Sequence, residues 1–452
     1  MARIVVAHAF DVEPPKDQQH PVKWYRSTFY NLTILGLCNF MAPGIWGAMN
    51  SLGAGGAESP ALVNTANALT FCLMVLSCYY SGAIVHYIGI KYALVIGTIG
   101  YAPFAAGLYT NNRFDNKWLV LLGAALCGLS AGIFWMAEAA IAISYPEPWN
   151  KGKALGYWLT YRLCGQILGG AINLGINANN DKAGKVSYHV YEVFIALQAA
   201  GPFVAFFLNK PEQVQRRDGR KVNLDMTESP WKQVKRTTRL FFSKKFLLVV
   251  FWIGQAAIFQ RPSILHTLTH FLDRSSISLR LRTRWAFWTI VVLQGAWWTW
   301  ITVMVARYRH EKPTLDWNDG GFGAGFGVYV MLTIGFQVNY LFLYFIVTNL
   351  AVFEYDVVHF AALLRGTESA WQAISYGLTS LTIFGEVGGV YFNFALWAVA
   401  VLPAWLVLRH FGSDQLHEEV SKEPETDHEA VLEESVKAEK EKVVDVAATN
   451  AD

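Results

Sequence analysis

The sequence predicts an all-α membrane protein that crosses the bilayer many times. Of its 452 residues, 53% are apolar and only 16% are charged, whereas about 25% of the residues of a soluble chain are usually charged. The mean hydropathy is +0.27, and the apolar residues are gathered in long runs. These observations exclude an ordinary soluble enzyme. At about 20 residues for each spanning helix, the chain has room for about ten to fourteen spans.

Six apolar runs lie in the first half of the chain. We expect spanning helices at 28–49, 61–85, 90–109, 118–144, 153–177 and 190–208. After the polar stretch 209–245, five further runs lie at 246–260, 285–306, 325–351, 361–384 and 386–410. Proline and glycine inside the runs are compatible with membrane helices, because neighbouring helices satisfy the backbone groups that a kink releases. The sequence thus predicts about eleven spans.

The runs and the charges predict five parts: an N-terminal tail (1–27), a six-helix half (28–208), a basic loop (209–245), a second helical half (246–411) and an acidic tail (412–452). For the first six spans, the side that holds the N-terminus has 18 lysines and arginines, against four on the other side. Positive residues stay in the cytoplasm, so we expect a cytoplasmic N-terminus and loop. Residues 413–452 contain 13 acidic residues and four lysines, which predicts disorder.

The basic cluster of the loop has two interpretations. It is a solvated topology signal, or it contacts anionic lipid. Its members are Lys232, Lys235, Arg236, Arg239, Lys244 and Lys245. Because basic residues in a membrane protein sort by topology, the sequence does not indicate nucleic-acid binding.

Glu138 and Arg162 are the first candidates for chemistry, because ionisable groups inside membrane helices are costly and often functional. Glu138 lies seven residues before Tyr145 in the fourth run, and Arg162 nine residues past Lys153 in the fifth. At about 1.5 Å per residue, their depths are about 10 and 14 Å, close enough for a partly buried pair. The pair could bind a proton or cation during transport, or simply clamp two helices; the sequence leaves both open.

A loop motif separates the second and third runs. Gly82, Gly89 and Lys91 fit the spacing G-x-L-A-D-R-x-G-R-K-x-x-L of the major facilitator superfamily, with His86 at the acidic position. Asp273 and Arg274 resemble its second copy. With six runs and a basic loop before the second helical set, the chain resembles this superfamily, whose fold has two six-helix halves facing each other across a central path.

Segments 100–103, 108–113, 131–148 and 165–175 resemble a narrower group, the uncoordinated-93-like family, best in its fungal branch. The resemblance implies twelve spans. It also implies either secondary transport of a small solute or ion by alternating access, or a non-transporting subunit with a membrane-protein partner, since the founding animal member is regarded as a regulatory subunit of a potassium channel. In a transporter, Glu138 would couple transport to protons.

The resemblance also suggests substrate contacts, because the first, fourth, seventh and tenth helices usually line the cavity in this superfamily. Asn39, Gln255, Gln337 and Asn339 lie in these helices. Gln166 and Glu368 are further polar residues inside predicted spans. Hydrogen bonds between helices, worth about 0.6 kcal/mol on average, are the alternative role for each of them.

The sequence predicts no enzyme site, no cofactor and no metal. It has no phosphate-binding glycine loop that ends in Lys-Ser or Lys-Thr. His266 and His270 are four residues apart, but no glutamate follows the first of them as in the zinc motif.

The second half is too short for the six spans that the resemblance implies. Residues 246–272, which precede Asp273, number 27, whereas two crossings of about 30 Å of hydrocarbon need about 40 residues. The sequence therefore predicts that most of the eighth span is missing. With eleven crossings, the acidic tail would lie on the opposite side from the N-terminus.

Overall fold

The computed structural model describes residues 19–51, 60–177, 186–222, 224, 229–255, 277–311, 319–350, 356–379, 387–409 and 411. Helices dominate these residues, and the β-type pairing among them is an isolated bridge between Ser27 and Gln215. The all-α prediction is confirmed. Five stretches within the described ranges are long and apolar enough to cross a bilayer: Thr28–Asn50, Leu62–Phe114, Trp118–Ser144, Leu279–Glu311 and Gly389–Leu408.

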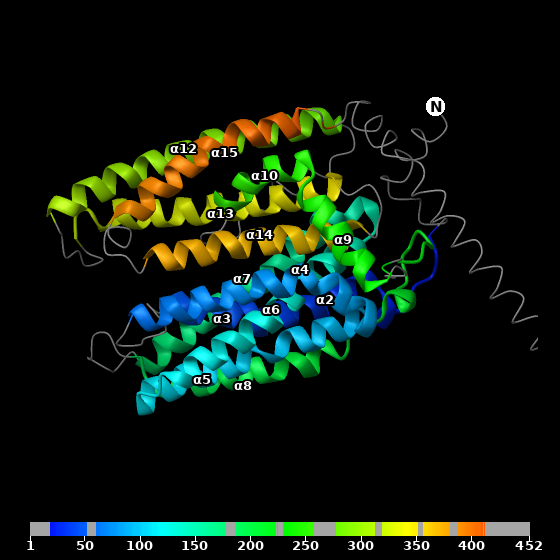
Figure 1. Cartoon of the computed structure of the whole chain (residues 1–452), viewed down its shortest axis with the longest axis horizontal. Coiled ribbons are helices and arrows are strands. Elements are labelled where there is room, and N and C mark those ends of the chain that lie inside the picture. Colours follow the sequence, from blue (N-terminus) through cyan, green and yellow to red (C-terminus); the bar gives the residue numbers. More distant parts are fainter. Residues whose placement is uncertain are drawn as a thin grey trace, which may run out of the picture.

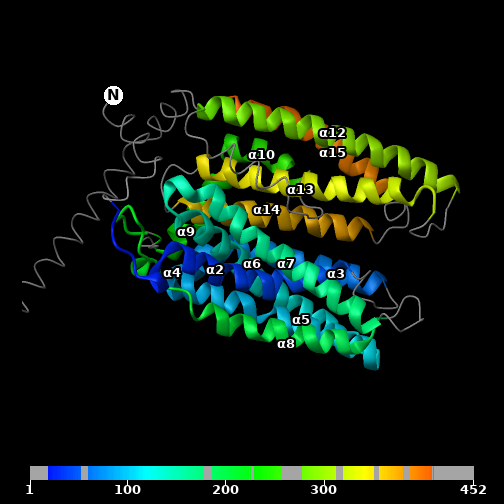
Figure 2. The same cartoon turned by 180° about the vertical axis from the view of Figure 1, so that it is seen from behind.

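The first half forms one bundle (Figures 1 and 2). Its helices are α2 (Thr28–Asn39), η3 (Phe40–Gly44), α3 (Ile45–Ser51), α4 (Pro60–Ile99), α5 (Tyr101–Phe114), α6 (Trp118–Ser144), α7 (Lys151–Asn177) and α8 (Tyr188–Ala205). The expected first span is continuous through α2, η3 and α3, with a π-helical turn around Pro43, whose missing N–H cannot bond within the helix.

The basic stretch 209–245 contains α9 (Pro230–Phe241), and the second half forms α10 (Lys244–Gln255), α12 (Leu279–Glu311), α13 (Phe322–Leu350), α14 (Asp356–Thr379) and α15 (Gly389–Leu408). Helix α14 packs on α4 and α6 and thereby joins the two halves, as both views show (Figures 1 and 2). Residues 256–276 lie outside the described ranges, so the incomplete eighth span stays a prediction.

Glycines allow the first-half helices to pack closely. A Cβ at Gly128 or Gly132 would overlap atoms of α4, and one at Gly165 would lie 2.6 Å from the Phe40 carbonyl oxygen. Hydrogen bonds reinforce these approaches: the Thr70 hydroxyl donates to the Ala124 carbonyl at 3.0 Å. Small residues at the contact are a general device of membrane helices, which cannot rely on a hydrophobic effect between them.

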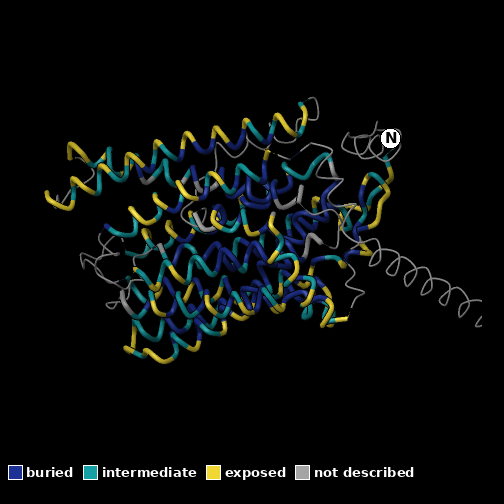
Figure 3. The backbone as a smooth tube through the Cα atoms, turned by 45° about the horizontal axis from the view of Figure 1, so that its top comes forward, coloured by how far each residue is buried: buried dark blue, intermediate teal, exposed yellow. Residues whose placement is uncertain are grey.

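Apolar side chains on the outside of the second half match a lipid environment. In α12, Trp285 is 62% exposed and Val292 is 68% exposed. The buried residues concentrate in the middle of the molecule, while the outermost helices are exposed along much of their length (Figure 3). Exposed apolar surface of this extent marks contact with lipid or protein.

The basic stretch 209–245 is more ordered than a solvated loop. Arg216 is 4% exposed and donates to the carbonyls of Ser144 and Tyr145 at the end of α6. Within the same stretch, α9 packs against α4 and α14. The Thr237 hydroxyl and the His359 ring nitrogen Nδ1 are 3.0 Å apart there, so α9 ties the two halves together at this end of the bundle.

Candidate functional site

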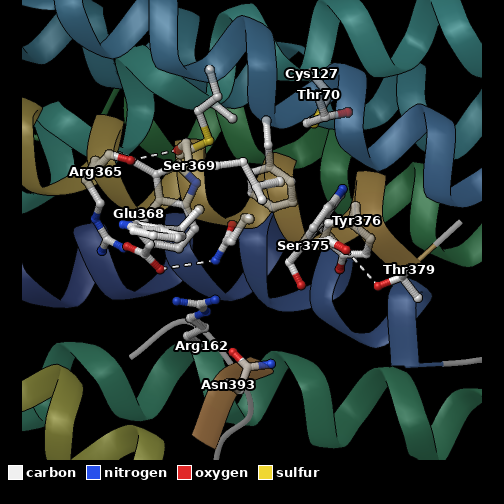
Figure 4. Close-up of a pocket in the computed structure, with 18 of the residues that line it drawn as sticks. Thr70, Cys127, Arg162, Arg365, Glu368, Ser369, Ser375, Tyr376, Thr379 and Asn393 are labelled. Atoms are coloured by element: carbon white, nitrogen blue, oxygen red, sulfur yellow. Dashed lines mark hydrogen bonds and ion pairs between the residues drawn. The ribbon is translucent and has the colours of Figure 1, made fainter. Parts of the chain in front are cut away.

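A cavity of about 330 Å³ lies between the two halves. Helices α3, α4, α5, α6 and α7 contribute to its wall from one side, and α14 and α15 from the other. Its lining includes Arg162 on α7 and a set of α14 side chains between Arg365 and Thr379 (Figure 4). Small-molecule sites in proteins commonly occupy about 300–1,000 Å³, so the cavity is large enough for a small ligand.

Helix α14 presents a polar stripe to this cavity. Arg365, Glu368, Ser369, Gln372, Tyr376 and Thr379 all line it. They lie at positions i, i+3, i+4, i+7, i+11 and i+14, which places them on one face of the helix. Polar side chains are costly inside the membrane, so this face of α14 is a candidate surface for ligand contact.

Arg365 is held in a cage of aromatic rings. Its side chain is almost fully buried, and its Nη1 lies 2.8 Å from Glu368 Oε2. Its guanidinium carbon is 4.1 Å from the ring centroid of Trp135 and 4.9 Å from that of Tyr340, and Nη2 donates to the Tyr344 hydroxyl. Ion pairing and cation–π attraction together offset the cost of burying this charge.

Trp135 of α6 contacts a second arginine. The guanidinium carbon of Arg162 lies 4.7 Å from its ring centroid. One indole ring in the cavity wall therefore contacts a cation from α7, in the first half, and a cation from α14, in the second half. A movement between the halves must change at least one of these contacts.

Glu138 lies one helical turn from Trp135 on α6 and is fully buried. The indole Nε1 of Trp158 donates to its Oε1 at 2.6 Å, while Oε2 has no hydrogen-bond partner among the described residues. Both Arg365 and Arg162 act on it electrostatically. A buried carboxylate with an unsatisfied oxygen is costly when ionised.

The structure brings together three residues that the sequence singled out. Arg162 and Glu368 line the cavity, and Glu138 lies beside it, in contact with Trp158 of α7. Glu138 and Arg162 were expected to interact directly. The hydrogen bond described for Glu138 comes instead from Trp158, and Arg162 stacks on Trp135. The electrostatic interaction of Glu138 with Arg162 remains.

Other expected contacts lie away from the cavity. Asn39 and Asn339 are fully buried, with polar side-chain atoms that lack hydrogen-bond partners within the described ranges, and neither is among the described lining residues. The Gln166 amide packs against Gly47 of α3, so closely that a Cβ at position 47 would overlap it. The side chains of Gln255 and Gln337 lie outside the description, as do Asp273 and Arg274 entirely.

The loop motif lines a second cavity, of about 290 Å³. His86, Gly89 and Lys91 face Lys210 and Glu212, which follow α8. Gly89 has φ 75° and ψ 159° and marks the break between the expected second and third spans. Residues with a Cβ essentially never adopt this conformation, which explains a glycine here. Gly82 packs near His359 and Gln233 instead.

Sequence reasoning missed Arg365, Trp135, Trp158 and Tyr344. A signal for Arg365 existed, because it is an arginine inside an expected span, three residues before Glu368. The aromatic residues gave no such signal, since tryptophan and tyrosine in an apolar run are indistinguishable from core residues.

Comparison with known proteins shows which family this chain resembles. A family model described as "Ion channel regulatory protein UNC-93" matches residues 64–257. The "Notoamide biosynthesis cluster protein O'" of Aspergillus versicolor is 36% identical over 417 residues, which cover 86% of this chain and 90% of that protein. An UNC93-like protein of Schizosaccharomyces pombe is 28% identical over 228 residues, 50% of this chain and 45% of that protein.

Among solved structures, a bacterial homologue of the iron transporter ferroportin in an outward-facing state has a similar fold. The TM-score is 0.53 at 12% sequence identity, and the match covers 84% of this chain and 99% of that chain. At this identity the likeness concerns the fold alone. The chain belongs to the UNC-93-like family of multi-pass membrane proteins and has the major facilitator fold.

Proposed function

We propose that the protein is a secondary transporter that moves a small solute across a membrane by alternating access, coupled to protons through Glu138. The observation that carries the proposal is the buried carboxylate of Glu138 beside two arginines, one from each half, at a cavity between the halves. Transporters of this architecture bind their substrates between two halves that rock against each other.

Two further features support this proposal. The polar stripe of α14 runs from Arg365 to Thr379, which is about 21 Å along the helix at 1.5 Å per residue, and ends away from α9. Helix α9, which we place in the cytoplasm with the N-terminus, closes the other end of the bundle. The relative that is 36% identical is named for a biosynthesis cluster, which associates it with a small molecule.

The experiment is a solute screen with the full chain in proteoliposomes that contain a pH-sensitive dye. A transported solute should carry protons inward and acidify the lumen when added outside. Glu138→Gln should abolish the proton signal while the protein reaches the vesicles in normal amount. A proton signal that survives in Glu138→Gln, with the same pH dependence, would refute coupling through this residue.

The second candidate is a subunit that regulates an ion channel, and the description of the matching family favours it. A regulator needs a stable surface toward its partner, but it needs no solute-dependent proton movement. This role would be favoured if potassium currents change when the protein is coexpressed with a channel, and if no solute in the screen produces a proton signal.

A further inference from the structure

We propose that the cavity binds a monovalent organic anion with a planar aromatic body, and that anion binding and protonation of Glu138 favour each other. This inference rests on the proposed function and names the substrate class of the same site. The fold alone does not define the substrate class, since one fold hosts many substrates.

The charges at the cavity decide between substrate classes. Arg162, Arg365 and Glu368 line it, and Glu138 lies one turn behind Trp135. With both carboxylates ionised, the charges of the four groups cancel. When Glu138 takes up a proton, the cluster has one positive charge in a medium of low dielectric, where an uncompensated charge is costly. A bound anion restores neutrality.

The groups that face Glu138 do not change this balance. They come from five other helices: Cys38 on α2, Tyr101 on α5, Arg162 on α7, Tyr344 on α13 and Arg365 on α14. Thiol and phenol groups are neutral near pH 7 at their usual pKa values, so the arginines supply the charge. Because linkage is reciprocal, a proton that raises anion affinity is itself bound more tightly when the anion is present.

Arg162 is the cation that an incoming anion reaches. Arg365 is enclosed by Trp135, Tyr340 and Tyr344 and is paired with Glu368. Arg162 is only partly buried, and it points from α7 toward the α14 side chains (Figure 4). A planar guanidinium offers two parallel N–H donors to a carboxylate, a geometry that lysine lacks.

The remaining wall is aromatic. Phe71 of α4 and Tyr376 of α14 stack across the halves, with ring centroids 5.6 Å apart and planes inclined by 10°. Trp46 meets Phe71 edge-on at 5.7 Å. Trp371 and Phe392 also line the cavity. Planar rings pack favourably on such surfaces, so the aromatic wall favours a flat ligand over a sugar or a bare ion.

Three probes with the same ring test the substrate class: indole-3-acetate (anionic), indole-3-acetamide (neutral) and tryptamine (cationic). Isothermal titration calorimetry with the full chain in detergent measures their affinities at pH 6. We expect indole-3-acetate to bind at least tenfold more tightly than either of the others. Equal affinities, a preference for tryptamine, or no binding of any probe would overturn the inference.

Variants test the two residues separately. Arg162→Gln should remove the preference for the anion, and Arg162→Lys should keep a weaker preference. Arg307→Gln, at an exposed site on α12, should leave the preference unchanged.

In the wild type, affinity for indole-3-acetate should fall as pH rises above the titration of Glu138, by up to about tenfold per unit for one linked proton. In Glu138→Gln it should stay high at all pH values. Retained anion preference in a monodisperse Arg162→Gln protein, or an unchanged pH profile in Glu138→Gln, would contradict the inference.

Failure of this inference is distinguishable from failure of the proposed function. Proton-driven accumulation of a neutral or cationic solute, without preference for the anion, overturns the substrate class alone. Tight, pH-dependent anion binding without any movement across proteoliposomes overturns transport and leaves the binding site.

Discussion

At the scale of single residues, the site is an arrangement of one buried and one partly buried arginine around one indole ring, with a carboxylate one turn away. Trp135 contacts Arg162 and Arg365, and Trp158 holds Glu138. A hydrogen bond to a charged group contributes about 1.5–3 kcal/mol. The Trp158 indole is therefore one of several influences on how readily Glu138 gives up its proton, together with burial and Arg365.

Replacing the fully buried Trp158 with Phe removes this donor and keeps an aromatic ring, while the smaller phenyl group leaves a small cavity. Because the indole N–H stabilises the ionised carboxylate, its loss favours the protonated form, which then persists to higher pH. The midpoint of the pH profile of uptake should move upward by about one to two units, at 1.36 kcal/mol per unit. Trp118→Phe, at an exposed position, is the control. A profile that stays in place, or moves to lower pH, would contradict this role of Trp158.

At the scale of helices, sequence patterns predicted most of the elements and few of their contacts. The runs at 118–144 and 153–177 agree closely with α6 and α7. Helix α9 was not predicted, because a short helix with many cations has the same sequence pattern as a solvated loop. Contacts between helices cannot follow from spacing along one helix; examples are Tyr344 with Arg365 of α14 inside the second half, and Tyr344 with Trp158 of α7 across the two halves. Glu138, Arg162 and Glu368 were identifiable because charges are rare in apolar runs.

Two glycines give a matched test of the break in α4. A Cβ added at Gly89 or at Gly170 would meet no described atom within 4 Å, but of these two only Gly89 has a positive φ, of 75°. Gly89→Ala should destabilise the protein by about 1–3 kcal/mol through backbone strain. Gly170→Ala should be neutral, or stabilise by up to about 1 kcal/mol. Thermal unfolding in detergent measures both; equal effects would show that the Gly89 conformation is not required.

At the scale of the whole molecule, the number of crossings fixes where the chain ends lie. The sequence predicts eleven spans, whereas the family resemblance implies twelve, and the difference falls in residues 256–276, outside the description. Eleven crossings place an N-terminal tag inside and a C-terminal tag outside. Protease added to sealed vesicles whose cytoplasmic side faces inward should then remove only the C-terminal tag, and permeabilisation should expose both. Protection of both tags in these vesicles would support twelve crossings instead.

The central claim, that Glu138 couples solute movement to protons across a cavity between two halves, is tested most directly by comparing two transport modes. Glu138→Gln mimics a permanently protonated carboxyl, so it should still exchange labelled for unlabelled solute across proteoliposomes, yet it should fail to accumulate solute when a proton gradient is imposed. The wild type should do both. Accumulation by Glu138→Gln to the wild-type level would contradict the account.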